Sequence, residues 1–474
     1  MQRKILIFWI LFLLVFPSII PISLGSNFKN KDMNLKSSFI VNSGKVLYVG
    51  GNGPGNYTFI QDAINDSHDG DTIFVYDDLS PYFENISINK QIFLIGENKY
   101  TTIIDGRNTK DDGITINTEN VTIQSLTIKD FRDDSIGSWA QAGIKIYSSN
   151  TTINNIRLIY NRIGIEVYCG AYNITIKNNE LINDGILLGN YFKSQEFPDV
   201  TLRDFIHNIA NNTINGRPLY YFTNINDFVI PNDAGQIILV NCSNVTIKDI
   251  RMSDNDFSII LAYCSNCLLE NLTISDTDGE VLFFECSNNT IQNNTITNTF
   301  KAICLEIKSK NNIVRYNNVS ENYVGLSIYA DANNNSVYKN KAYNNENAGV
   351  EIISYHGGIQ RDNNVSENLF YNNQIGIHLY QNSVNNTIQK NSIRDNKIGI
   401  LLQDRSCNNK IIKNNIQKNL IPAVFLKCKN NKWDGNYWNR PRILPKLIFG
   451  LGLIGFPRIN IDWHPALKPY DIEV

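Results

Sequence analysis

One short phrase returns seven times between Asn288 and Trp438: NNTIQNNTI (288–296), NNIVRYNNV (311–319), NNSVYKNKA (334–342), NNVSENLF (363–370), NNTIQKNSI (385–393), NNKIIKNNI (408–416) and NNKWDGNYW (430–438). Its first apolar position recurs at steps of 23, 23, 28, 23, 23 and 22 residues, on Ile291, Val314, Val337, Val365, Ile388, Ile411 and Trp433. Self-similarity at a period between about 20 and 50 residues is typical of solenoid proteins.

The phrase also predicts which kind of solenoid the repeats build. Apolar and polar residues alternate within it, which is the periodicity of strands and not of helices. A second apolar set follows five residues after the first: Ile296, Val319, Ala342, Phe370, Ile393, Ile416 and Trp438. The spacing of leucines and the helical half-turn of leucine-rich repeats are absent. The sequence therefore predicts an all-β fold, a parallel β-helix solenoid with coils about 4.8 Å apart.

A column of asparagines accompanies the two apolar columns. It consists of Asn294, Asn317, Asn340, Asn368, Asn391, Asn414 and Asn436. Stacked coils place these amides directly above one another, where each can hydrogen-bond to the next, as in other stacked β structures. We therefore predict a structural asparagine ladder.

Composition excludes one large class of function. The chain has 474 residues, 42% of them hydrophobic, and a formal net charge of -2 with no basic or acidic block. Nucleic-acid binding usually requires a basic patch or stripe. The sequence thus argues against a nucleic-acid partner.

The first 25 residues have the pattern of a secretory signal peptide. Arg3 and Lys4 precede an apolar run, and a small-residue site ends near Gly25. The alternative is an uncleaved membrane anchor, which would be the protein's only membrane contact. Either way we expect a secreted, periplasmic, pseudoperiplasmic or cell-surface protein.

The remainder divides into a lead-in (26–44), a parallel β-helix (45–438) and a C-terminal cap (439–474). At its start, Phe59, Ile60, Ala63 and Ile64 share one face of a short helix behind a Thr58 N-cap, which would close the open end of the coils. At its end, Gly and Pro interrupt the apolar run after Leu444 too often for a good membrane span.

The sequence resembles the NosD-like right-handed parallel β-helix family over about residues 44–474, and the resemblance implies an all-β, right-handed parallel β-helix solenoid of the pectin-lyase-like type. The likeness is carried by YTFIQDAIN (57–65), GDTIFVY (70–76), NNTINGRPLYY (211–221), the N-N-x-I coils, and the ending GNYWNRP (435–441), IDWHPA (461–466) and PYDI (469–472), which is similar to that of exported archaeal members. The resemblance implies a range of roles, from a periplasmic copper-linked accessory protein of nitrous-oxide reductase maturation to carbohydrate-binding proteins and sugar hydrolases. No family motif transfers a ligand or catalytic residue to a numbered position here.

A column of carboxylates is the first candidate site. Asp254 and Asp256 are followed 22 residues later by Asp276 and Asp278, and Asp130 takes the matching position in an earlier coil. Such carboxylates can bind Ca²⁺, or two of them can act as acid and base in a polysaccharide hydrolase or lyase. The favoured interpretation is a solvated Asp-rich turn, because turns prefer Asp in any case. Signatures such as Gly-His-Gly, Arg-Ile-Lys and Asp-Pro-His are absent.

Cysteines form a second column, because Cys242, Cys264 and Cys286 are each 22 residues apart. Three interpretations remain open, in this order: stacked structural thiols, disulfides, which an exported protein permits, or a soft-metal site for Cu(I) or Zn.

Tyr329, Tyr355 and Tyr380 follow the third strand of their coils, where exposed rings could stack on sugars. From these columns we expect a glycan- or polysaccharide-binding protein. The alternatives are a copper-accessory protein, a polysaccharide-cleaving enzyme and a passive surface or adhesion protein. Asn-x-Ser/Thr sequons such as Asn120 and Asn244 would allow glycosylation, although the coil phrase generates them automatically.

Overall fold

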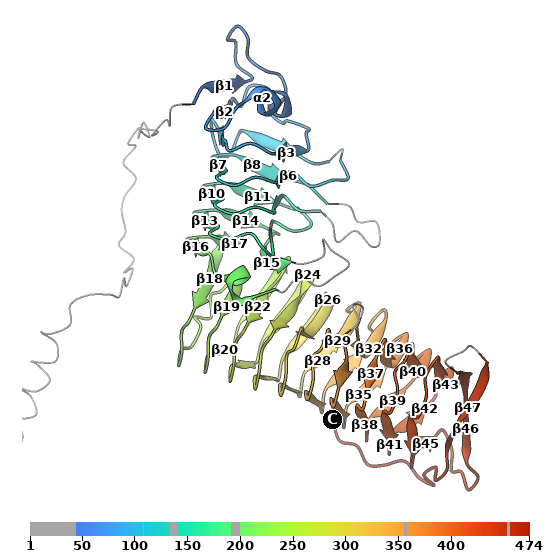
Figure 1. Cartoon of the computed structure of the whole chain (residues 1–474). Helices are drawn as coiled ribbons and strands as arrows, with labels where there is room; N and C mark the ends of the chain where they lie inside the picture. Colours follow the sequence, from blue (N-terminus) through green and yellow to red (C-terminus); the bar gives the residue numbers. More distant parts are fainter. Residues whose placement is uncertain (1–43, 108, 133–140, 191–199, 355–357, 453–455) are drawn as a thin grey trace, which may run out of the picture. The chain divides into compact units, whose positions relative to one another are not determined.

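The computed structural model describes residues 44–474 apart from 108, 133–140, 191–199, 355–357 and 453–455. The predicted signal peptide (1–25) and nearly all of the predicted lead-in (26–44) lie outside the described residues. Short parallel strands succeed one another along nearly all of the described chain (Figure 1).

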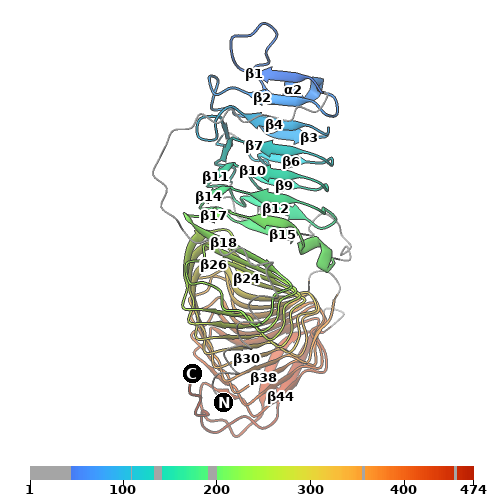
Figure 2. The same cartoon turned by 90° about the vertical axis from the view of Figure 1, so that its left-hand side faces the viewer.

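The early coils form three stacks of parallel strands (Figure 2). The first stack consists of β1 (Val46–Val49), β2 (Thr72–Val75), β4 (Phe93–Gly96), β7 (Thr122–Gln124), β10 (Thr152–Asn154), β13 (Thr175–Lys177) and β16 (Asn208–Ala210). The second consists of β5 (Ile103–Asp105), β8 (Thr127–Lys129), β11 (Arg157–Ile159), β14 (Glu180–Ile182) and β17 (Thr213–Ile214). The third consists of β3 (Ile86–Ile88), β6 (Ile114–Ile116), β9 (Ile144–Ile146), β12 (Ile165–Tyr168) and β15 (Ile186–Asn190).

The later coils repeat this arrangement after β18 (Arg217–Thr223). The strands that carry the first apolar set are β20 (Thr246–Lys248), β23 (Leu268–Glu270), β25 (Thr290–Gln292), β27 (Ile313–Arg315), β30 (Ser336–Tyr338), β34 (Asn364–Ser366), β38 (Thr387–Gln389), β41 (Lys410–Ile412) and β44 (Lys432–Asp434). Those of the second set are β21 (Arg251–Asn255), β24 (Thr273–Phe284), β26 (Thr295–Glu306), β28 (Asn318–Ser320), β31 (Lys341–Tyr343), β35 (Leu369–Tyr371), β39 (Ser392–Arg394), β42 (Asn415–Gln417) and β45 (Tyr437–Trp438).

A third stack is formed by β19 (Gln236–Val240), β22 (Ile259–Ala262), the second halves of β24 and β26, β29 (Val324–Tyr329), β32 (Ala348–Ile353), β36 (Ile375–Tyr380), β40 (Ile398–Gln403), β43 (Ile421–Leu426) and β46 (Lys446–Leu451). The remaining elements are β33 (Gln360–Arg361), β37 (Ser383–Val384), β47 (Pro457–Asp462), the helix α2 (Ile60–Asp66) and the 3₁₀ turn η1 (Leu202–Phe205).

Strand register confirms the predicted parallel β-helix. Ile291 pairs with Val314, and the same column continues through every repeat to Trp433. The second set does so from Ile296 to Trp438. Every one of these side chains is buried. The apolar columns therefore form the core that holds successive coils together, each buried side chain contributing roughly 1.5–3 kcal/mol.

Asparagine amides run through the core as ladders. In the predicted column, each Nδ2 from Asn294 to Asn414 donates to the next Oδ1 at 2.9–3.0 Å. Each of these Oδ1 atoms also accepts a backbone N–H from the coil before. The N-N pair at the start of the phrase has a physical reason. The first residue, such as Asn288, adopts a left-handed φ of 58° that Asn tolerates, and the second, such as Asn289, enters a second ladder, in which its Nδ2 donates to Asn312 Oδ1.

The N-terminal helix differs in detail from its prediction. Ile60, Ala63 and Ile64 are fully buried as expected, but Phe59 is 54% exposed. The N-cap residue is Phe59 and not Thr58, and its side chain forms no capping hydrogen bond. The Glu84 carboxylate instead accepts the N–H groups of Ile60 and Gln61, both at 2.9 Å. A carboxylate from a distant coil thus satisfies the free donors of the first turn, which local sequence could not reveal.

Between the early and the later coils the parallel ladder is interrupted at β17 and β18, which pair antiparallel. The strand β18 then starts the later coils by pairing parallel with β19. Across this junction the Gln236 amide bonds both backbone groups of Ile186, and the Asp256 carboxylate accepts N–H groups from Gly164 and Gly185. Side chains of the later coils therefore satisfy backbone groups at the end of the β15 stack.

Beyond β45 the chain adds the antiparallel pair β46 and β47. These strands continue the coil ladders, since β46 pairs with β43 and β47 with β44. Among the described residues, no helix has the length and apolar character that crossing a bilayer requires.

Candidate functional site

Asp254 and Asp276 occupy equivalent turns in adjacent coils. Both follow strand residues that are in register, and their φ angles are 55° and 56°. Tyr160, Asn183 and Asn298 take left-handed φ values between 53° and 60° at the corresponding turns. Asp and Asn enter this conformation more readily than most residues. The turn geometry alone therefore accounts for these aspartates, while their carboxylates remain exposed.

Asp256 is inaccessible, unlike the other candidates. Its side chain is fully buried, and Oδ2 accepts the N–H groups of Gly164 and Gly185 at 2.6 Å each. Burial, followed by the neighbouring Asp184 carboxyl, raises the pKa of Asp256 well above its usual value. This carboxyl joins coils and has no surface that a substrate could reach.

Asp278 is held between two arginines. Arg132 donates to both of its oxygens, at 2.7 and 3.2 Å, and the Arg162 guanidinium lies 3.8 Å from Oδ1. The Arg132 guanidinium also lies 5.5 Å from the centroid of the Tyr160 ring. Residues 146 positions apart in sequence thereby meet across the junction.

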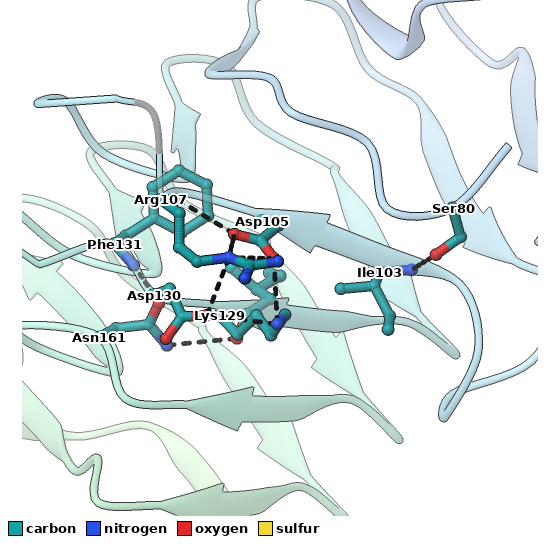
Figure 3. Close-up of polar contacts among 9 residues, drawn as sticks. Ser80, Ile103, Asp105, Arg107, Lys129, Asp130, Phe131 and Asn161 are labelled. Carbon is teal, nitrogen blue, oxygen red and sulfur yellow. Dashed lines mark hydrogen bonds and ion pairs between the residues drawn. The ribbon is translucent and has the colours of Figure 1, made fainter.

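Asp130 belongs to an ion cluster with Lys129 and Arg107 (Figure 3) and does not line the cleft described below. Its carboxylate lies 3.2 Å from Lys129 Nζ and 3.8 Å from Arg107 Nε. Both cations also bind the buried Asp105 carboxylate. Burial alone would raise the pKa of Asp105, but hydrogen bonds from Arg107 and Lys129 lower it below its usual value. The predicted set of converging oxygen ligands for Ca²⁺ therefore does not assemble among the described aspartates.

An open cleft of about 480 Å³ lies at the junction of the two sets of coils, and we call it the junction cleft. Its lining consists of Arg132, Tyr160, Arg162, Asn183, Asp254, Asn255, Asp276, Thr277, Asp278, Asn298, Thr299, Phe300, Glu321, Tyr323 and Glu346. Three of the four predicted carboxylates thus lie in one cleft, and the fourth, Asp256, lies beneath the surface.

Aromatic rings accompany these charges. Phe300 and Tyr323 stack with centroids 5.1 Å apart and an interplanar angle of 7°. Tyr160 and Tyr323 are 50% and 44% exposed. Flat rings beside carboxylates, amides and guanidinium groups can stack on a sugar ring and hydrogen-bond its hydroxyls.

A smaller, mostly apolar pocket of about 220 Å³ shares Phe300 with the junction cleft. It contains Glu280, Lys301 and Glu306 among side chains such as Leu187 and Phe257. Burial raises the pKa of Glu280 to about 7. Burial opposes the charge of Lys301, but Cys304 and the surrounding glutamates raise its pKa above the usual value. The sequence analysis did not predict this cluster. The signal that could have revealed it is the presence of charged residues within the apolar strands β24 and β26.

The predicted tyrosine column is interrupted. Tyr329 is 5% exposed, not a free platform, and its ring contributes to the apolar pocket 4.7 Å from Lys301 Nζ. Ile353 takes the register position between Tyr329 and Tyr380. Tyr380 is half-buried beside His378, with ring centroids 5.5 Å apart, and Tyr355 lies outside the described residues. The aromatic surface that the structure does expose at a cleft comes from Tyr160 and Tyr323.

The cysteine column is present as stacked, buried thiols. All eight cysteines are free. Cys242, Cys264 and Cys286 are at most 1% exposed, and each thiol contacts a carbonyl oxygen of its own strand at 3.3–3.4 Å. Cys264 N–H also donates to Cys286 Sγ at 3.4 Å. The sulfur atoms follow one another along the coils instead of converging on a common point.

Converging metal donors occur elsewhere. Within the described part of the chain, the group whose ligand atoms all lie within 4.8 Å of one another is Glu280, Cys304 and Glu306. Two of the three are hard carboxylates, which Cu(I) disfavours, and the Lys301 ammonium among them opposes a cation. The described donors therefore do not fit a copper centre.

Two family profiles match neighbouring parts of the sequence. The family described as "Right handed beta helix region" matches residues 200–342, and "Periplasmic copper-binding protein (NosD)" matches residues 358–443. A search of curated proteins finds no match.

Solved structures with similarity to this fold include three carbohydrate-active proteins. The mannuronan C-5 epimerase AlgE6 A-module of Azotobacter vinelandii is 14% identical, with a TM-score of 0.37 over 81% of this chain and 95% of that chain. The exopolygalacturonase of Thermotoga maritima is 11% identical, with a TM-score of 0.32 over 78% and 86%. The GH136 lacto-N-biosidase of Eubacterium ramulus is 12% identical, with a TM-score of 0.31 over 69% and 64%. The two family matches, over residues 200–342 and 358–443, together with the stacked parallel coils, support a NosD-like right-handed β-helix family for this chain.

Proposed function

We propose that this chain is an exported protein that binds glycan in the junction cleft. The observation that carries the proposal is the stacked, partly exposed pair Phe300 and Tyr323 beside the carboxylates and guanidinium groups of one open cleft. Apolar faces and hydroxyls alternate around a sugar ring, and such a lining offers partners for both. Export is supported by the signal-peptide pattern and by the periplasmic description of the matched family.

The charge of the cleft narrows the glycan class. Five carboxylates (Asp254, Asp276, Asp278, Glu321 and Glu346) face two guanidinium groups (Arg132 and Arg162), an excess of three negative charges. Like charges would repel a polyuronate from this surface. The ligand we propose is therefore a neutral or amino-sugar glycan.

A glycan array followed by calorimetric titration tests this function. We expect binding to neutral or amino-sugar glycans, and Tyr323→Ala should weaken it by about tenfold, because a lost ring contact is worth about 1.4 kcal/mol. Tyr316→Ala is the matched control, since Tyr316 is 48% exposed but lies outside the cleft. A blank array, or equal weakening by both substitutions, would refute the proposal.

Polysaccharide cleavage in the same cleft is the second candidate function. The observation in its favour is that Asp254 and Asp276 follow strand residues in register, one coil spacing of about 4.8 Å apart, close to the carboxyl separation of a retaining glycosidase. Asp276→Asn should then abolish sugar release while glycan binding remains. Unchanged release would exclude this role for Asp276.

A copper-accessory role comes from the description of the matched family alone. Elemental analysis of protein purified without oxygen tests it, and stoichiometric copper would support it. Because the described thiols are buried in a column, we expect no stoichiometric copper.

A further inference from the structure

The terminal pair of strands has two unlike faces. The strands β46 and β47 lie side by side in the red part of the chain (Figure 1). Leu447 lies opposite Ile461, Phe449 opposite Ile459 and Leu451 opposite Pro457. Residues directly opposite each other in an antiparallel pair share a face. These six side chains, all apolar, therefore form one face, which we call the hairpin face.

The opposite face packs into the protein at Ile448 and Asp462. Ile448 is 2% exposed and belongs to the apolar core of the later coils. Asp462 is fully buried, and its Oδ2 accepts the indole N–H of Trp438 at 2.9 Å. Because side chains alternate along a strand, the hairpin face is the outward one.

The exposure of apolar groups is concentrated here. Phe449 is 62% exposed and Ile459 48%, and Ile443, Leu444 and Phe456 nearby reach 91%, 77% and 69%. Outward strand positions in earlier coils are polar, as Thr387 and Gln389 in β38 illustrate. A contiguous apolar surface of this kind marks an interaction site.

The segment that carries the hairpin face is basic, although its Lys446 and Arg458 take register positions of the opposite face. Residues 439–468 contain Arg440, Arg442, Lys446, Arg458 and Lys468, while their single acidic residue, Asp462, is buried. Burial, together with Arg442 and Arg440, lowers the pKa of Lys446, so these three cations lie close to one another. A partner for this surface has to supply both apolar contact and negative charge.

We propose that the hairpin face docks on the surface of an anionic membrane. Exposed aliphatic and aromatic side chains enter the boundary between headgroups and acyl chains, and flanking lysines and arginines pair with anionic headgroups. A second copy of the chain fits less well, because face-to-face packing would bring the two sets of cations together. The attachment is peripheral and independent of the junction cleft.

Hydrogen exchange of the full chain, followed by mass spectrometry, tests the docking directly. We expect vesicles of equal parts phosphatidylcholine and phosphatidylglycerol to slow exchange in peptides covering 443–452 and 456–467. Pure phosphatidylcholine vesicles should slow it far less. Exchange is measured separately for each peptide. The apolar N-terminal segment is the same in the wild type and in every variant, so any vesicle binding by that segment does not obscure the protection of the hairpin peptides.

Two variants distinguish the apolar and electrostatic contributions. Phe449→Ser with Phe456→Ser should remove the protection and lower vesicle partitioning attributable to the hairpin by about tenfold or more. Arg440→Gln, Arg442→Gln and Arg458→Gln together should abolish the preference for anionic vesicles. Phe59→Ser with Phe83→Ser is the control, since both rings are about half exposed and lie far from residues 439–468 in sequence.

Three results would overturn the proposal. The first is exchange at 443–467 that vesicles leave unchanged. The second is equal protection in the wild type and the Phe449→Ser, Phe456→Ser variant, with thermal unfolding showing both to be folded. The third is protection that rises with protein concentration without vesicles, which would assign the hairpin face to a second copy.

Discussion

A buried asparagine is the residue that this fold depends on most. Asn340 shows why, since its Oδ1 accepts the backbone N–H and the Nδ2 of Asn317, and its own Nδ2 donates to Asn368 Oδ1 and Val314 O at 2.9 Å each. All of these groups are buried. One amide therefore satisfies backbone and side-chain groups in the coils on either side.

Replacing Asn340 by alanine should be costly. The change leaves the backbone N–H of Asn317 without its acceptor and removes one of the two hydrogen bonds of Asn317 Nδ2, which keeps its bond to Ile291 O. Each unsatisfied buried group costs about 1–3 kcal/mol. We expect a loss in the free energy of unfolding on the order of 2–4 kcal/mol, measured by denaturant titration. Lys341→Ala, an exposed change in the same coil, should cost less than about 0.5 kcal/mol. Equal effects of the two substitutions would contradict the ladder as a source of stability.

At the scale of elements, the junction after β17 is held by a buried acid pair. Burial raises the pKa of Asp184 to about 7 even though Asn161 donates to both of its oxygens. The pKa of Asp256 is raised as well, and its Oδ1 has no hydrogen-bond partner among the described residues. The folded protein thus holds protons that the unfolded chain releases above an ordinary carboxyl pKa of about 4. Stability contributed here is present at low pH and is lost as the pH rises from about 4 to about 7.

The substitution Asp256→Asn tests this junction. Its amide oxygen can still accept from Gly164 and Gly185, but the group no longer ionises. We expect the variant to be more stable than the wild type at pH 8, by on the order of 1–3 kcal/mol, and little changed at pH 4. Thermal unfolding at the two values measures the effect, with Asp249→Asn, at an exposed turn with φ 58°, as control. A variant that unfolds earlier at pH 8 would show that the Asp256 charge stabilises the junction.

At the scale of the whole molecule, stability is distributed along a line. Each coil contacts mainly its neighbours, so a solenoid opens in sections where its nearest-neighbour contacts are weakest. The antiparallel step from β17 to β18 replaces regular parallel pairing, leaving side chains such as Gln236, Asp256 and Arg132 to connect the two sides.

Native-state hydrogen exchange should therefore reveal two cooperative blocks, before and after residue 217. The double substitution Gln236→Ala with Asp256→Ala should widen the difference in opening free energy between the two blocks. Both side chains form hydrogen bonds with backbone groups of the earlier coils, and the substitutions remove these bonds. A single opening free energy across residues 44–438, unaffected by the double substitution, would argue against the junction as a boundary.

The repeat alone was sufficient to predict the parallel coils, the two apolar columns and the row of asparagines. Each of these depends on residues that recur at one period, and parallel pairing converts a fixed period into direct vertical contact. The same spacing predicted that Asp254 and Asp276 lie in adjacent coils, and both line the junction cleft. The prediction of a Thr58 N-cap was wrong, because the Glu84 carboxylate from elsewhere in the chain caps the helix. The prediction of an exposed Tyr329 was also wrong, because the earlier coils cover this position where they pack on β24 and β26.

Sequence periodicity determined the fold, since it reports contacts between neighbouring coils. Only the tertiary structure decided which columns reach solvent. The break in the period between β17 and β19 brings Arg132 and Arg162 to Asp278, buries Asp256, and creates the junction cleft. The tertiary structure also shows that the last pair of strands, β46 and β47, turns an apolar face outward. Contacts between residues as far apart as Arg132 and Asp278 have no period in the sequence, and therefore leave no repeating signal to read.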